Sequence, residues 1–241
     1  MNKTIVLFMV EVSFIPFFYS CYTVSTSVMP EALNKKEIAI RHSLGTAVNY
    51  YTPKMPVFEY DPIIDKEKYE IDLMVNYFFL LRIGLPEKFE FTYKLNYQTA
   101  IPFYFFGNYA SHFLLLKYQF LNKRMKASIF GGLNIEDISK MAICDYSLIS
   151  GISLGSGNIY SGIQYEFGGN AAPHNTAMMS TMIYCGWRIP FPKKKFLEII
   201  PEVGVGYTSY IFNIINDAQN ISFPTCYFNV GIQKMRKIGK H

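Results

Sequence analysis

Histidine and carboxylate side chains are the candidates for catalysis in this chain of 241 residues. Ser111 and His112 are adjacent in sequence, and His174, Asp145 and Asp217 lie in segments expected to connect strands. A histidine can act as a general base toward a serine or water nucleophile, and a carboxylate can orient it. If the connecting segments converge, these residues could form a hydrolytic site. Such residues are more commonly solvated side chains in loops. We therefore favour a protein without enzymatic activity over an enzyme.

The four cysteines do not have the close spacing of a metal or redox site. Cys185 and Cys226 fall in phase with apolar residues, so we expect them to be small apolar side chains facing lipid. Cys144 falls in a connecting segment. The sequence contains no phosphate loop, zinc motif or dinucleotide fingerprint, and neither a metal nor a cofactor is expected.

The N-terminus has the pattern of an export signal, in which Lys3 precedes two apolar stretches separated by Glu11. The tetrapeptide ending at Cys21 resembles a bacterial lipoprotein processing site, which would make Cys21 an acylated residue. The alternative is that Cys21 belongs to a signal peptide that is cleaved further on, near 27–32. Residues 1–31 are therefore predicted to be a signal peptide, or a lipoprotein signal with a short leader.

Alternation of apolar and polar residues is the main structural signal in the rest of the chain. From Tyr69 to Leu81 every second residue is large and apolar, whereas the residues between them include Glu70, Asp72 and Asn76. A strand places the two sets on opposite faces. Ten such segments are predicted: 37–51, 69–83, 89–97, 112–121, 126–135, 146–155, 159–167, 177–189, 196–211 and 225–238.

The connections between these segments alternate between long and short. The long ones all follow odd-numbered strands, so they lie at one end of the structure: 52–68, 98–111, 136–145, 168–176 and 212–224. Half of the residues are hydrophobic (50%) and few are charged (17%), but outside the N-terminus no apolar run is long enough for a membrane helix. The sequence therefore predicts an all-β fold, an antiparallel up-and-down transmembrane β-barrel of about ten strands spanning residues 36–238.

The polar face carries equal numbers of basic and acidic residues. A ten-stranded barrel is narrow, and buried charges must be paired or hydrogen-bonded. We therefore expect an interior charge network and a mostly plugged lumen, with a narrow channel for small solutes as the alternative. The predicted members of the network are Arg41, Glu70, Asp72, Arg82, Glu90, Lys94, Lys117, Lys126, Glu166, Arg188, Glu198 and Glu202.

Residues 36–238 resemble the small outer-membrane β-barrel proteins of Gram-negative bacteria. The resemblance rests on this architecture and not on a signature motif. The resemblance implies a location in the bacterial outer membrane, with membrane lipid and possible further envelope proteins as partners. The net charge of +5 is too small to indicate a nucleic-acid partner. One departure is the C-terminus, where a basic tail ending in His241 follows the last strand, whereas such barrels usually end in an aromatic residue.

Three functions are compatible with these observations. The first is a structural, binding or envelope-complex component that acts through its long external loops, and the second is the narrow channel. The third follows from the resemblance, because a few barrels of this group are rim enzymes that act on lipid A or on peptides. We favour the first, because the two sets of interior charges are balanced.

Overall fold

The structure is a computed structural model that describes residues 26–51, 70–101, 108–136, 146–170, 176–192, 194–214 and 217–238. Within these residues no helix is long and apolar enough to cross a membrane. Nearly all of the described backbone is extended. The elements are β1 (Glu37–Tyr51), β2 (Glu70–Gly84), the short 3-10 turn η2 (Pro86–Lys88), β3 (Phe89–Ile101), β4 (Asn108–Asn122), β5 (Met125–Glu136), β6 (Tyr146–Ser156), β7 (Ile159–Asn170), β8 (Thr176–Trp187), β9 (Ile189–Phe191), β10 (Lys194–Ile214) and β11 (Asp217–Lys237).

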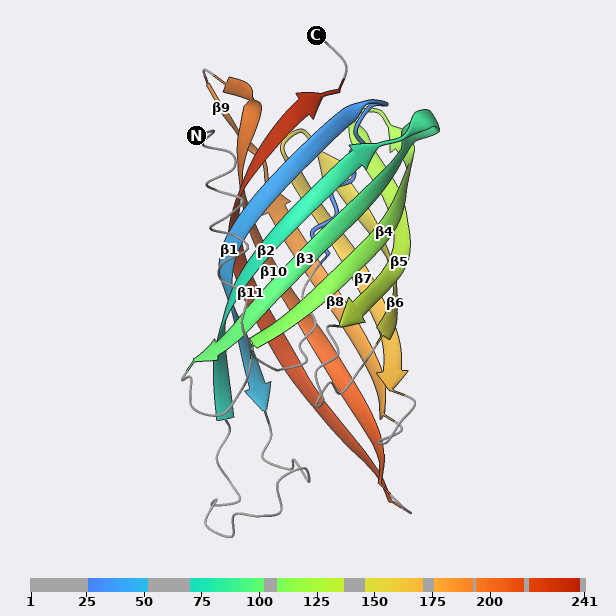
Figure 1. Cartoon of the computed structure of the whole chain (residues 1–241), viewed down its shortest axis with the longest axis vertical. Helices are drawn as coiled ribbons and strands as arrows, with labels where there is room; N and C mark the ends of the chain where they lie inside the picture. The colour runs from blue at the N-terminus through green and yellow to red at the C-terminus, as the bar shows by residue number, and fades with distance from the viewer. Residues whose placement is uncertain are drawn as a thin grey trace, which may run out of the picture.

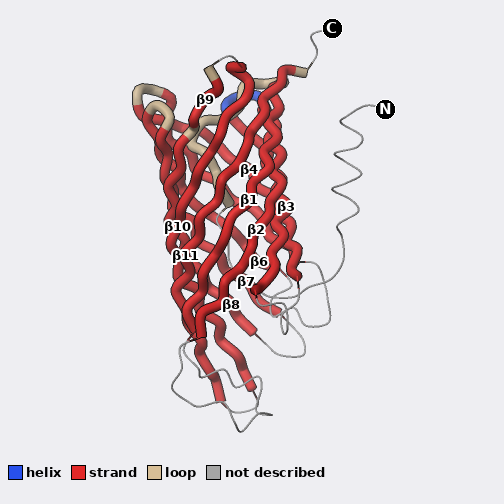
Figure 2. Tube along the Cα trace, turned by 90° about the vertical axis from the view of Figure 1, so that its left-hand side faces the viewer, coloured by secondary structure: helices blue, strands red, loops and turns tan. Residues whose placement is uncertain are grey.

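The strands form one closed antiparallel sheet (Figures 1 and 2). Strands β1 to β8 pair in chain order, β10 pairs with β8 and β11, and β11 pairs with β1, which completes the circle. The ten long strands form the wall, and β9 is a short extra strand paired with β10. The predicted antiparallel barrel of about ten strands is therefore confirmed.

The last two long strands differ from the prediction. β10 and β11 pair continuously from Leu197 opposite Lys234 to Ile214 opposite Asp217, so the predicted long connection 212–224 is wrong. The segment contains Asn, Asp and Pro, which favour turns, but pairing with the neighbouring strand satisfies the backbone hydrogen bonds whatever the side chains are. This hairpin extends beyond the neighbouring strands at the lower end in Figure 1.

The two faces of the wall have opposite character. Along β6, Ser147, Ile149 and Ser153 point inward and are buried, whereas Tyr146 and Leu148 are exposed on the outside. The other strands for which side chains are described alternate in the same way, and the large exposed side chains include Leu116, Phe167, Ile183, Trp187 and Val205. An apolar outer surface on a closed sheet requires lipid around it. The protein is therefore a transmembrane barrel of the outer-membrane type, which is located in the bacterial outer membrane.

Two of the inward-facing glycines make room for aromatic rings on neighbouring strands. An ideal Cβ on Gly162 would lie 2.4 Å from the ring of Tyr184, and one on Gly186 would lie 2.3 Å from the ring of Tyr160. Each ring lies over the glycine paired with its tyrosine on the neighbouring strand, and the two buried rings contact each other edge to face. Gly157, in the predicted turn between β6 and β7, has a φ of 61° that favours glycine.

Candidate functional site in the barrel lumen

The described chain begins inside the barrel. Residues 26–33 precede β1, and Thr26, Ser27, Val28, Met29 and Leu33 are all buried. Figure 1 shows this segment as a thin blue trace within the wall of strands. Thr26 contacts Gln164, which lies midway along β7, whereas Lys36 leads directly into β1. The segment therefore fills the half of the lumen nearer the short connections.

Side chains of the wall bind main-chain atoms of this lumenal segment (residues 26–34). The main-chain N–H groups of Thr26, Ala32 and Leu33 donate hydrogen bonds to carboxamide and carboxylate oxygens on β7, β4 and β3. The carbonyl oxygens of Val28, Met29 and Glu31 accept hydrogen bonds from wall donors. These donors are Tyr184 (2.9 Å, to Val28), Lys117 (3.0 Å to Met29 and 2.9 Å to Glu31) and Arg82 (2.7 Å, to Glu31).

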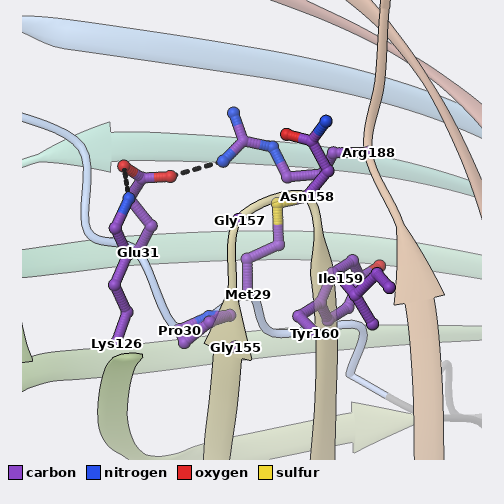
Figure 3. A pocket seen from close by; sticks show the side chains of 10 residues that line it. All are labelled: Met29, Pro30, Glu31, Lys126, Gly155, Gly157, Asn158, Ile159, Tyr160 and Arg188. Atoms are coloured by element: carbon purple, nitrogen blue, oxygen red, sulfur yellow. Dashed lines mark hydrogen bonds and ion pairs between the residues drawn. The ribbon is translucent and has the colours of Figure 1, made fainter. Parts of the chain in front are cut away.

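Glu31 is the charged side chain of the segment, and it lies between two basic residues (Figure 3). Its carboxylate forms ion pairs with Lys126 of β5 and with Arg188, which follows β8. These residues line a shallow pocket at the end of the barrel that carries the short connections. Burial would raise the pKa of Glu31, but the hydrogen bond from Lys126 and the charges of Arg188 and Lys126 outweigh it and hold the pKa below its usual value.

Apolar side chains of the segment pack against inward-facing residues of the wall. Val28 joins a cluster with Phe113, Leu115, Phe130 and Ile149. Met29 joins a second cluster with members on β1, β2, β7, β8, β10 and β11, namely Ala47, Met74, Tyr160, Met182, Tyr184, Ile200 and Tyr227. The segment is thus part of the packed interior rather than a loose strand in a water-filled pore.

Ion pairs of the wall surround the segment. Glu90 lies 2.8 Å from Arg82 and 2.7 Å from Lys117, and all three side chains are buried. Glu198 pairs with Arg188 at 2.6 Å. Every one of these distances is within hydrogen-bonding range, which is the condition for holding such charges away from bulk water.

The carboxylate of Glu202 differs from those of the preceding ion pairs in accepting its hydrogen bonds from neutral donors. Tyr160 donates a hydrogen bond of 2.7 Å to it, Tyr227 one of 3.0 Å, and Ser27 of the segment one of 2.7 Å. Arg41 lies farther away, at 3.8 Å. Ser27 is therefore a direct side-chain link between the segment and the wall.

The half of the lumen nearer the long connections holds a different arrangement. The ammonium group of Lys94 lies 4.2 Å from the ring centroid of Phe78 and 5.4 Å from that of Phe113, within the range of cation–π contacts. Glu166 accepts hydrogen bonds from Asn134 and Ser147. Aromatic rings and charges thus occupy the lumen beyond the end of the segment.

Ten of the twelve residues assigned to the interior network have described side chains, and all ten lie on the inward face. Glu70 and Asp72 belong to the part of β2 whose side chains lie outside the description. Neither Glu31 nor the lumenal position of residues 26–34 was predicted, because residues 1–31 were assigned to a signal peptide or to a lipoprotein signal with a short leader. The one signal available was the run of small and polar residues from Thr23, which does not resemble a continuing apolar signal core.

No family model and no curated protein matches this sequence. Solved outer-membrane barrels are similar to it in fold. The outer membrane protease OmpT from Escherichia coli aligns over 86% of this chain and 100% of its own, with 8% identity and a TM-score of 0.41. An outer membrane channel from Pseudomonas putida aligns over 89% and 100%, with 6% identity and a TM-score of 0.47. The translocator domain of the autotransporter NalP from Neisseria meningitidis aligns over 83% and 89%, with 9% identity and a TM-score of 0.37.

The catalytic candidates are not brought together in the described part of the chain. Ser111 is buried on the inward face of β4, whereas the adjacent His112 points outward, where its Nδ1 lies 2.9 Å from the hydroxyl of Tyr93. Asp217 is the first residue of β11 rather than a loop residue, and its side chain is not described. His174 and Asp145 lie outside the described residues.

The cysteines and metal ligands add no further site among the described residues. Cys185 and Cys226 are free thiols on the exposed outer face. Cys21 and Cys144 lie outside the described residues. The described residues contain no group of three or more His, Cys, Asp or Glu side chains that could hold a metal ion.

Proposed function

We propose that this protein is a closed outer-membrane barrel that acts as a structural, binding or envelope-complex component through its long external loops. The observation that carries this proposal is the lumenal segment, whose side chains and main chain are bonded to the wall from β2 around to β10. A lumen filled in this way has no continuous aqueous path along the segment. Other molecules would then contact the protein at its outer surface and at the connections between its strands.

Planar-bilayer recording of the full-length protein tests this proposal. We expect insertion of the purified barrel to give no conductance steps above the baseline at neutral pH. Heat-modifiable migration on a gel, measured on the same sample, shows that the protein in the bilayer is a folded barrel. Regular conductance steps from folded protein would contradict the closed lumen.

A related proposal concerns the N-terminus. Cleavage near 27–32 would remove groups that bind Gln164, Tyr184 and Glu202, and it would separate Glu31 from Lys126. Buried polar groups that lose their partners destabilise a fold. This supports processing upstream of Thr26, as acylation at Cys21 would require.

Mass spectrometry of the protein purified from membranes decides between the two processing sites. We expect a mature chain that retains Thr26, with the mass of an attached lipid if Cys21 is acylated. A mature chain that begins between residues 27 and 32 would overturn the proposed retention of the segment.

A further inference from the structure

We propose that the barrel binds anionic phospholipid at the end that carries the short connections, on the outer face of the seam between β11 and β1. The ligand chemistry is a phosphate diester headgroup whose acyl chains lie against the apolar outer surface. This inference adds a lipid-binding site to the protein. It depends neither on the closure of the lumen nor on the long loops.

The surface at the short-connection end is strongly basic. Its exposed side chains include nine Lys and Arg residues: two before β1, one in η2, two between β4 and β5, one at the start of β10 and three near the end of β11. The acidic residues on this surface are Glu37 and Glu87, which leaves an excess of seven positive charges. The residues at 193, 195 and 239–241, whose side chains are not described, include no acid in the sequence, so they do not offset this excess. The charges of the lumen are counted separately, because they pair with one another.

The basic side chains are concentrated where β11 closes the barrel. Lys234 is paired with Ile40 of β1 and with Leu197 of β10, and Arg236 is paired with Ile38 of β1. The start of β1, the end of β11 and β9 lie at the same end in Figure 1. We call the following five residues the seam cluster: Lys36, Lys194, Lys234, Arg236 and Lys237.

The positive charge of the seam cluster is largely uncompensated. Lys237 lies 3.6 Å from Glu37, but its side chain is 71% exposed. Within the described part of the chain, Lys234 and Arg236 form no ion pair with an acidic residue. The main-chain N–H of Ile238 donates a hydrogen bond of 2.7 Å to the carbonyl oxygen of Lys36, which holds the two ends of the seam together. Like charges held close together repel each other, so an anion that bridges them stabilises the seam cluster.

The seam cluster borders the lipid-facing surface. Lys234 and Arg236 share the outward phase of β11 with Val230 and Ile232, which are exposed on the apolar outer face. Alternate residues of a strand lie about 7 Å apart on one face, so the two cations are close neighbours. Long basic side chains at the edge of an apolar surface extend toward the headgroups.

Aromatic side chains mark the edge of the lipid at the same end of the barrel. Trp187, the last residue of β8, is 53% exposed, and Phe120, near the end of β4, is 50% exposed. The ring of Phe89, the first residue of β3, lies 4.8 Å from that of Tyr118. Aromatic residues at strand ends lie at the level of the headgroups. The exposed basic residues at these strand ends therefore lie near the lipid phosphates.

This position favours lipid over a water-soluble acidic partner. Such a partner would have to displace lipid to reach the outward-facing Lys234 and Arg236. The short connections of outer-membrane barrels face the periplasm, where the membrane leaflet contains anionic phospholipids. Each basic side chain near a membrane surface raises the affinity for anionic lipid by about fivefold.

Quenching of tryptophan fluorescence by brominated lipids tests the site in the full-length protein. Trp187 is the one tryptophan of the chain, and it follows Gly186, which pairs with β10 next to the seam strand β11. In mixed bilayers at equal mole fraction, we expect brominated phosphatidylglycerol to quench Trp187 more than brominated phosphatidylcholine does. In the double variant Lys234→Gln, Arg236→Gln this preference should fall by about fivefold for each charge removed.

Lys123→Gln with Arg124→Gln is the matched control, because it removes the same charge at the same end but in the turn between β4 and β5. It should leave the lipid preference at Trp187 at the wild-type level. Lys234→Arg with Arg236→Lys should keep that preference, because the charges remain. Heat-modifiable migration on a gel verifies that each variant is a folded barrel.

Three results would overturn the lipid site. Equal quenching of the wild-type protein by the two lipids would remove the selectivity for anionic headgroups. An equal loss of preference in the seam variant and in the matched control would show an effect of net charge rather than a site at the seam. Inorganic phosphate at constant ionic strength should not displace brominated phosphatidylglycerol, and displacement would show a site for free phosphate instead of lipid.

Discussion

Glu90 offers the sharpest test of how the interior is held together. Its carboxylate accepts hydrogen bonds from Arg82 (2.8 Å from both Nε and Nη2), Thr92 (3.2 Å) and the main-chain N–H of Leu33 (2.9 Å), and Lys117 lies 2.7 Å away. Glu90→Ala leaves two buried cations without this partner. Removing one member of a buried ion pair costs about 3–5 kcal/mol, and we expect a loss of that size in the free energy of unfolding. Denaturant unfolding of the barrel in lipid vesicles measures it.

Two further variants make the Glu90 prediction refutable. Glu87→Ala, which removes an exposed carboxylate nearby, should change the free energy of unfolding by no more than about 0.5 kcal/mol. Replacing Arg82, Glu90 and Lys117 together with methionine should destabilise the barrel less than Glu90→Ala alone, because no unpaired charge then remains buried. A loss below about 1 kcal/mol in Glu90→Ala, or a triple variant less stable than the single one, would refute this account of the interior.

Three other predictions concern single features of the barrel. Because the pKa of Glu31 is held below its usual value, its ion pairs are complete at neutral pH and are lost as the pH falls through that lowered pKa. Protection of the amides of the lumenal segment against exchange should therefore persist down to the ordinary pKa of a glutamic acid, about 4.3, and fall only at lower pH; a loss of protection above that pKa would contradict the role of these ion pairs. Gly162→Ala should lower the free energy of unfolding by about 1–3 kcal/mol through its contact with the ring of Tyr184, and a double-mutant cycle with Tyr184→Leu should show coupling; additive effects would argue against that contact. His112→Phe leaves the hydroxyl of Tyr93 without its partner on the lipid face, so it should destabilise by about 1–3 kcal/mol, and adding Tyr93→Phe should restore most of the loss.

The sequence predicted the strands best where every second residue faces lipid. The strand Glu37–Tyr51 was predicted to the residue, because apolar side chains such as Leu44 must alternate with lumenal ones such as Arg41. Alternation failed at 212–224, where pairing between β10 and β11 maintains the strands through residues that favour turns. Local propensity was overridden there by cross-strand hydrogen bonds.

The lumenal segment could not be predicted from its own sequence. Thr26–Asn34 has no periodicity, because each of its residues contacts a different part of a surrounding wall rather than one face of a sheet. Its position depends on long-range partners such as Gln164 and Tyr184, which lie more than a hundred residues away. The alternation of the strands predicted that Lys126 and Arg188 face inward. It did not predict that both contact Glu31.

The position of the segment also constrains the order in which the barrel assembles. Strand β1 directly follows the segment in sequence, and β1 closes the wall by pairing with β11, the most C-terminal of the described strands. Once that seam has formed, the wall has no side entrance, so Thr26–Asn34 must already be inside or must be drawn in through an open end. Zipping β1 to β11 therefore encloses the segment in the same step that completes the sheet. The protein's first described residues and strand β11 are coupled in folding, although Asn34 and Asp217 are 183 positions apart in sequence.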